Sequence, residues 1–141
     1  MEGRLVLACA MVCAVPACAT LQTSYEGPAM TTVCELQAMP TMFDQERISV
    51  SAEVLSDGIH WTGLVDSSCQ LGVVLIRPAN GFDGNAASFY RALYSGAPGT
   101  TDKEIDGVFV GIFDFRPELE TDTLALHLEE VVSFRVRPRD R

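Results

Sequence analysis

RISVSAEVL, residues 47–55, alternates apolar and polar side chains along its whole length. That alternation is typical of a strand with one buried and one exposed face. The turn residues Ser56-Asp57-Gly58 follow, and IHWTGLV (59–65) continues as a second strand. Two such strands joined by a short polar turn predict an antiparallel hairpin. The centre of the chain is therefore β.

Three more strands and one helix are predicted beyond this hairpin. LGVVLIRP (71–78) is apolar nearly throughout, as in a strand that is covered on both faces. AASFYRALYSG (86–96) has the period of a helix with one apolar face. Two long strands follow, at 105–115 and 123–138. The alternation of the last strand breaks at Glu129-Glu130, which predicts a bulge or bend, and the glycines of the strand before it predict bulges or close packing.

The order strand, strand, strand, helix, strand, strand is that of the OB-fold. We therefore expect a mainly β domain, a small five-stranded OB-fold-like barrel with a helix between strands 3 and 4. An open β-sandwich or an α+β sheet with the same elements is the alternative. A short N-terminal helix is predicted within residues 31–40, where Thr31 or Thr32 can cap its start and Pro40 limits its end.

The first 19 residues are typical of a secretory signal peptide. Arg4 precedes LVLACAMVCAVPACA (5–19), which carries no charge and is shorter than the roughly 20 residues that a membrane-spanning helix needs. We predict a signal peptide over residues 1–19, a tether over 20–30 and a single OB-like domain over 31–141. A buried N-terminal helix is the alternative for the apolar run.

Two cleavage sites remain open at the end of this peptide. Ala17-Cys18-Ala19 has the small residues that signal peptidase prefers, and Val15-Pro16-Ala17-Cys18 resembles a bacterial lipobox, in which Cys18 becomes acylated. The chain is thus predicted to reside in the bacterial cell envelope, as an outer-membrane lipoprotein held in the membrane by a lipid on Cys18 or as a soluble periplasmic protein.

Cys34 and Cys69 remain in the chain after either cleavage. Two cysteines in an oxidising compartment predict one disulfide. Two reduced and buried thiols are the alternative if the chain is not exported.

The net charge of −9 argues against one class of partner. Nucleic-acid binding normally needs a basic surface, so we predict no nucleic-acid partner. An acidic surface also repels anionic membranes and favours solubility.

The segments Val33-Cys34-Glu35-Leu36 and Gly63-Leu64-Val65-Asp66-Ser67-Ser68-Cys69 form the pattern V-C-x-L … G-L-x-D-x-x-C, with Pro40 between them. This pattern resembles that of a group of small, mostly uncharacterised bacterial exported proteins and lipoproteins. The resemblance implies an OB-like domain held by a disulfide, and it brings no established catalytic residues. Relatives often carry a glycine in the turn before the first strand, where this chain has Asp44-Gln45-Glu46, so we expect that turn to differ.

The candidate ligand-binding residues are Trp61, His60, Asp66, Tyr90 and Tyr94. Trp61 is the only tryptophan, and it can either stack on a ligand or seal the core beside the disulfide. Tyr90 or Tyr94 is expected on the exposed side of its helix, where a partner can reach it.

The sequence contains no recognisable catalytic set and predicts no cofactor and no metal site. The function predicted first is a non-enzymatic envelope module that binds an envelope protein or a small ligand. The alternative is a periplasmic metal-dependent protein or enzyme that uses His60, Asp66 and His127, although their spacing matches no metal-ligand motif. A structural accessory of an envelope complex is the third possibility.

Overall fold

The computed structural model describes residues 27–78, 81, 84–121 and 123–140. The predicted signal peptide, Cys18 and most of the predicted tether lie outside these residues. Among the described residues, no helix is long and apolar enough to cross a membrane.

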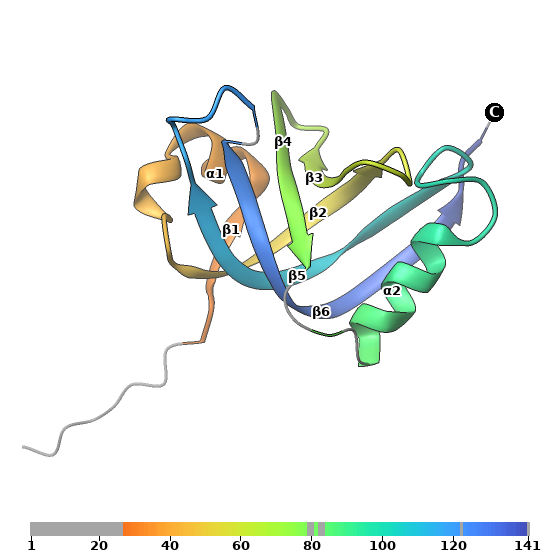
Figure 1. The fold of residues 1–141 in the computed structure, drawn as a ribbon. Coiled ribbons are helices and arrows are strands. Elements are labelled where there is room, and N and C mark those ends of the chain that lie inside the picture. The colour runs from red at the N-terminus through yellow and green to blue at the C-terminus, as the bar shows by residue number, and fades with distance from the viewer. Residues whose placement is uncertain (1–26, 79–80, 82–83, 122, 141) are drawn as a thin grey trace, which may run out of the picture.

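The described chain is mainly β, with six strands and two α-helices (Figure 1). The strands are β1 (Ala29–Thr32), β2 (Arg47–Ser56), β3 (Thr62–Asp66), β4 (Cys69–Pro78), β5 (Lys103–Phe115) and β6 (Leu124–Pro138). The helices are α1 (Val33–Ala38) and α2 (Gly84–Tyr94), and a 3-10 turn (Pro40–Met42) follows α1. All five predicted strands and both predicted helices are present within a few residues of their expected bounds.

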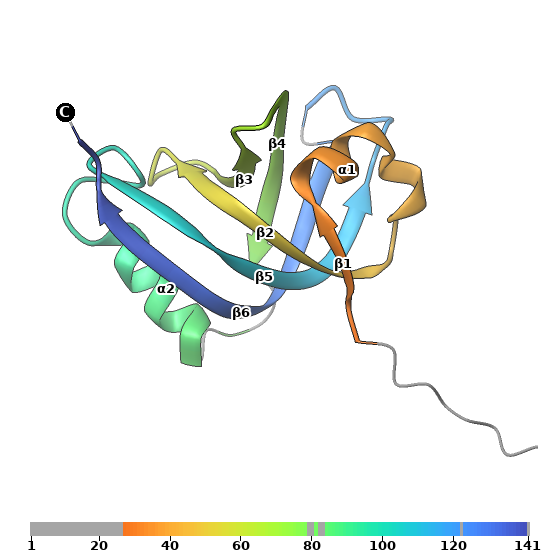
Figure 2. The same cartoon turned by 180° about the vertical axis from the view of Figure 1, so that it is seen from behind.

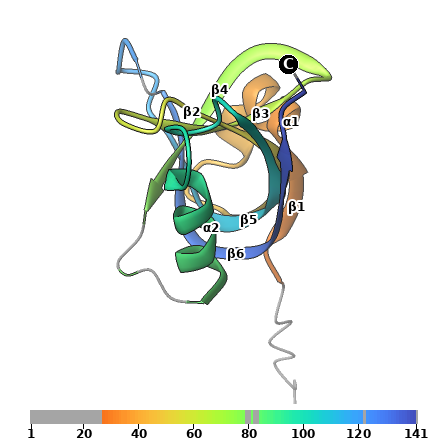
Figure 3. The same cartoon turned by 90° about the vertical axis from the view of Figure 1, so that its right-hand side faces the viewer.

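The strands form one mixed sheet in the order β1-β2-β3-β4-β6-β5, and β5 also pairs with β2. The β1–β2 and β4–β6 pairs are parallel, and the other pairs are antiparallel. Viewed from one end, β5 and β6 curve strongly rather than lying flat (Figure 3). The two helices lie at opposite ends of the sheet, as the front and back views both show (Figures 1 and 2).

Strand β1 was not predicted. Ala29 and Met30, which the sequence analysis assigned to the tether, form its first half and pair with Ile48 and Ser49. This strand has only four residues, and it gains its backbone partners from β2, which is distant in the sequence.

Helix α1 begins in a capping box at Thr32. The Thr32 hydroxyl accepts a hydrogen bond from the Glu35 N–H at 3.1 Å, and the Glu35 carboxylate accepts one from the Thr32 N–H at 3.0 Å. Val33 and Leu36 are fully buried. A disulfide between Cys34 and Cys69 joins this helix to the start of β4, as predicted.

The turn before β2 contains a residue whose backbone has a conformation typical of glycine. Gln45 adopts a left-handed backbone conformation, with φ of 63°, which is uncommon for a residue other than glycine. Its N–H donates to the Phe113 carbonyl at 2.8 Å, and its side-chain amide donates to Asp114 at 3.0 Å. Contacts to β5 thus hold a conformation that glycine would adopt without strain.

The core is one continuous apolar cluster that every strand from β2 to β6 and both helices enter. Phe89 of α2 is fully buried at its centre, and its ring meets those of Phe109 and Phe134 edge to face, at centroid distances of 5.4 and 5.8 Å. The other large, fully buried side chains are Phe113, Leu36, Ile48, Leu64, Leu93, Ile105 and Leu126.

The sequence predicts a bulge or a bend at Glu129-Glu130 of the last strand, and the β5–β6 pair has a bulge there. The register shifts twice, between Val108 and Phe109 and between Val110 and Gly111. Leu128 pairs with Gly111 and Glu130 with Val110, so Glu129 is the extra residue of one bulge. A Cβ at Gly111 would lie 2.1 Å from the His127 carbonyl oxygen, so only glycine allows this approach.

Candidate functional site

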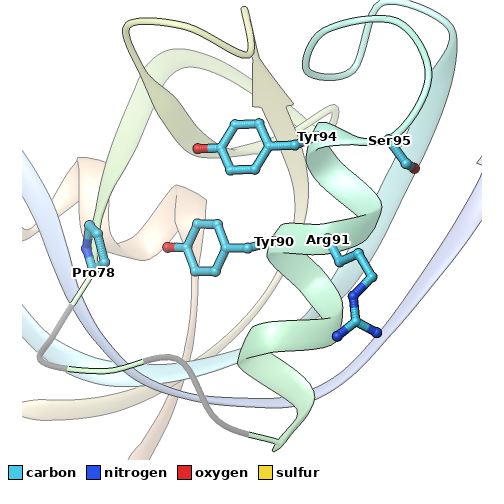
Figure 4. Close-up of a pocket in the computed structure, with 5 residues that line it drawn as sticks. All are labelled: Pro78, Tyr90, Arg91, Tyr94 and Ser95. Atoms are coloured by element: carbon cyan, nitrogen blue, oxygen red, sulfur yellow. The ribbon is translucent and has the colours of Figure 1, made fainter.

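A pocket of about 590 Å³ opens between α2 and the end of β4. It is lined by Pro78, Tyr90, Arg91, Tyr94 and Ser95 (Figure 4). A smaller hollow of about 160 Å³ shares Pro78 and both tyrosines. Its remaining walls are Ile59, His60, Trp61, Thr62 and Ile76. We refer to the two together as the aromatic pocket.

Helix α2 supplies one wall of the aromatic pocket through two tyrosines that are four residues apart. Residues at this spacing lie on the same helix face, and Figure 4 shows both side chains projecting in the same direction. The rings are stacked, with centroids 6.3 Å apart and planes 19° from parallel. Tyr90 also meets the buried Phe89 ring edge to face at 5.0 Å, so this wall rests on the core.

The tyrosine wall is apolar enough to affect ionisation. Burial, and then the proximity of the Tyr94 hydroxyl, raise the pKa of Tyr90 to about 12. Tyr90 therefore stays neutral at physiological pH. Tyr94 is 58% exposed and forms the outer edge of the wall.

The opposite wall is a loop that Asp57 organises. One oxygen of its carboxylate accepts the backbone N–H groups of Ile59, His60 and Trp61 at 2.9, 2.8 and 3.1 Å. The other oxygen lies 2.9 Å from Nδ1 of His60. The hydrogen bonds from Ile59 and His60 hold the pKa of the Asp57 carboxyl well below its usual range. The loop thus presents Ile59, 76% exposed, and Trp61, 38% exposed, at the pocket.

This capture of backbone amides also explains why β3 starts later than predicted. The sequence predicts a second strand from residue 59, but the amides of residues 59–61 bind Asp57, and the strand begins at Thr62. Trp61 consequently precedes β3. It lies outside the buried core and at the opposite end of the strand from Asp66, which pairs with Cys69 of the disulfide.

A second loop secures the first. The Thr100 hydroxyl accepts from the Ser56 N–H at 3.1 Å, and the Ser56 carbonyl accepts from the Thr100 N–H at 3.1 Å. Gly99 makes this contact possible, because a Cβ there would lie 2.3 Å from the Ser56 carbonyl oxygen and because its φ is +64°.

Lys103 holds the carboxyl end of α2. Its side chain is almost completely buried, and its ammonium group donates to the carbonyls of Ala92, at 3.2 Å, and Ser95. A cation at this end of a helix satisfies carbonyls that have no partner within the helix. The last turn of α2, which carries Tyr94, is therefore fixed to β5.

Four of the five candidate ligand-binding residues line the aromatic pocket, and Asp66 does not. Trp61, His60, Tyr90 and Tyr94 all line the smaller hollow. Asp66 ends β3 elsewhere, where its carboxylate accepts from the Ser68 hydroxyl and N–H at 2.6 and 2.9 Å. These hydrogen bonds lower the pKa of Asp66, which acts as a turn residue.

His127, named with His60 and Asp66 in the enzyme alternative, belongs to a separate polar cluster. Its Nε2 lies 3.3 Å from the carboxylate of Asp114, which also accepts from Arg116 at 2.8 Å and Gln45 at 3.0 Å. Burial disfavours the Asp114 carboxylate, but the hydrogen bonds from His127 and Arg116 outweigh it and lower the pKa. Within the described ranges, no group of three or more His, Cys, Asp or Glu residues could hold a metal ion.

Six further residues line the pocket without having been predicted, among them Ile59, Ile76, Pro78 and Arg91. Ile76 and Pro78 end a strand, and Arg91 lies beside Tyr90 in the helix, so each has an ordinary structural role when the sequence is considered alone. Only Ile59 could have been recognised from the sequence as a pocket candidate, because it is an apolar residue next to a polar turn. Only the folded chain brings these four side chains to one place.

Comparisons of the chain with protein-family models, curated proteins and solved structures gave no match.

Proposed function

We propose that the protein is a non-enzymatic binding module and that the aromatic pocket is its binding site. One observation supports this proposal above all: an exposed tryptophan and a stacked pair of tyrosines, from distant parts of the chain, line two hollows that share three of their lining residues. Small-molecule sites are concave and mostly apolar, with volumes of roughly 300–1,000 Å³, and the larger hollow lies within this range.

We further propose that β2 to β6 form an OB-like five-stranded barrel. In support, the pairings run β2–β3–β4–β6–β5 and return from β5 to β2, and α2 follows β4 in the chain. OB-folds bind ligands on the face of their second and third strands and on the adjoining loops. The corresponding parts here are β3, β4 and the loop between β2 and β3, which supply Trp61, Thr62, Ile76 and Pro78 to the pocket.

We also propose that the module acts in the bacterial cell envelope, either free in the periplasm or anchored by a lipid on Cys18. The signal-like residues 1–19 support export. The Cys34–Cys69 disulfide is also consistent with an oxidising compartment. A small ligand or an envelope protein is then the partner.

A fragment titration followed by NMR tests the binding proposal. The full chain is expressed with export and labelled with ¹⁵N, and indole and naphthalene fragments are added. We expect chemical-shift changes concentrated at Trp61 and the neighbouring amides. These changes should be smaller in Tyr94→Ala. Val132→Ala is the control, because Val132 is an apolar residue outside the pocket that is 45% exposed, against 58% for Tyr94.

Two results would contradict the proposal. Fragment-induced shifts spread evenly over the surface would mean that the pocket is not a site. A catalytic turnover abolished by substitution of His60 or Asp66 would instead support the enzyme alternative.

A further inference from the structure

The charges around the aromatic pocket differ from those of the whole molecule. The chain carries a net charge of −9, yet none of the described residues that line the pocket is Asp or Glu. Asp57 belongs to the loop that carries Ile59, His60 and Trp61, but its carboxylate is bound to backbone amides and to His60. Arg91 is the one lining residue with a permanent charge, and it makes no ion pair within the described part of the chain. An acidic protein therefore carries a pocket with a cationic edge.

We propose that the aromatic pocket binds a small anionic amphiphile, with its apolar body against Tyr90, Tyr94 and Pro78 and its acidic head at Arg91. This inference rests on the proposed function and adds the chemical class of the ligand.

The walls of the pocket match the apolar body. Pro78, Tyr90 and Tyr94 are common to both hollows, and Ile76 and Trp61 extend the same surface. Neighbouring parallel rings offer flat faces to an aliphatic chain or to an aromatic ring system. Because Lys103 and Asp57 hold the two walls in place, the site is largely formed before a ligand arrives.

The position of Arg91 matches the acidic head. Figure 4 shows the two tyrosines projecting to the side of α2 where Pro78 lies, whereas the Arg91 side chain points away from both rings. Arg91 nevertheless lines the larger hollow and is exposed, so its long side chain can be reached by an acidic group at the edge of the pocket. A ligand that buries its apolar part can keep its acidic head in water and still pair with the guanidinium. A planar guanidinium also matches a carboxylate or sulfonate geometrically.

A dispersed amphiphile fits these observations better than a membrane surface does. A protein of net charge −9 is repelled by anionic lipid as a whole, whereas a single small anion responds mainly to the nearby Arg91. The inference is therefore limited to free, monomeric amphiphiles.

Two fluorescent probes that differ only in the acidic group provide the test. 8-Anilinonaphthalene-1-sulfonate is the anionic probe, and N-phenyl-1-naphthylamine is the same aromatic body without the sulfonate. Energy transfer from Trp61, the only tryptophan, reports binding at the pocket. Dodecanoate serves as the aliphatic competitor, below its micellar concentration.

We expect Arg91→Gln to lower the affinity for the anionic probe roughly threefold to fivefold, which is the range of an exposed ion pair. The affinity for the neutral probe should not change. Arg139→Gln makes the same change of charge at an exposed residue outside the pocket and should alter neither. Tyr94→Ala should lower the affinity for both probes, and dodecanoate should displace both from the pocket.

The failures are distinguishable. If both probes bind and Arg91→Gln affects them equally or not at all, the anionic class is wrong and the pocket remains a binding site. If neither probe accepts energy from Trp61, the proposed function fails with it. Cosedimentation with anionic phosphatidylglycerol vesicles that Arg91→Gln abolishes would overturn the limit to free amphiphiles.

Discussion

Replacing Cys34 and Cys69 together by alanine should lower the free energy of unfolding by about 4 kcal/mol. The bond links residues that are 35 positions apart. The chain-entropy relation for a loop of that length gives roughly 13 cal/mol/K, which is about 4 kcal/mol at 25 °C. Since small domains are stable by only about 5–15 kcal/mol, this loss is a large share of the total.

The structure also indicates what this change should leave intact. Val33 and Leu36 of α1 are fully buried, so the helix keeps its packing without the bond. The bond lies at the start of β4, whereas Pro78, at the other end of that strand, belongs to the aromatic pocket. We therefore expect destabilisation without loss of the pocket.

Urea unfolding followed by Trp61 emission measures the effect, with the oxidised wild type and the wild type in excess reductant as references. The reduced wild type and the double alanine variant should unfold at similar urea concentrations. A loss below about 1 kcal/mol would refute the loop-entropy argument. Altered NMR signals at Trp61 in the folded variant would refute the claim that the bond and the pocket are independent.

Three other substitutions test the remaining structure. Asp57→Asn should release the loop and shift Trp61 emission to longer wavelength. Because the folded pKa of Asp57 lies below its ordinary value of 3.8, its contribution to stability is present above that pH and is lost as the pH falls toward the folded pKa. As the pH is lowered from 6 to 3, the free energy of unfolding in urea should therefore fall more steeply in the wild type than in Asp57→Asn. Equal slopes would contradict the lowered pKa of Asp57. Phe89→Ala should cost about 3–5 kcal/mol in urea unfolding, because it empties a fully buried site at the centre of the core, and a cost below about 1 kcal/mol would contradict that position. Gly111→Ala should cost about 1–3 kcal/mol, since its Cβ would overlap a backbone carbonyl, whereas Gly27→Ala, which meets no atom within 4 Å, should be neutral; equal effects would show that the close approach does not limit β5.

The sequence was most informative where one rule governs a long segment. Alternation over nine residues (47–55) predicts β2, and the helical period of residues 86–96 predicts α2, whose Phe89 and Leu93 are buried. The interrupted alternation near Glu129 predicts the bulge of β6. In each case local pattern and tertiary packing impose the same requirement on the same residues.

Local patterns failed where distant segments decide the structure. β1 is only four residues long, and its backbone partners come from β2. The start of β3 moves because the side chain of Asp57 competes for three amides. The pocket needs the end of β4 to lie beside α2, which no property of Pro78 or Tyr94 indicates by itself. Residue type alone indicates Trp61, His60, Tyr90 and Tyr94 as candidates. It does not indicate that they lie together in the fold.

The pairing of β2 with β5 has a consequence for how fast the chain folds. It joins residues that are 51 to 65 positions apart (54 with 105, and 47 with 112). Such non-local pairings require the chain to lose loop-closure entropy before the stabilising contacts form. We therefore expect folding times of milliseconds to seconds. The Cys34–Cys69 bond spans a shorter interval and, once formed, closes a loop that contains β2 and β3 and ends at the first residue of β4. An oxidised chain should therefore refold faster than a reduced one, and the rate of its folding then depends on the redox state of the compartment where it emerges.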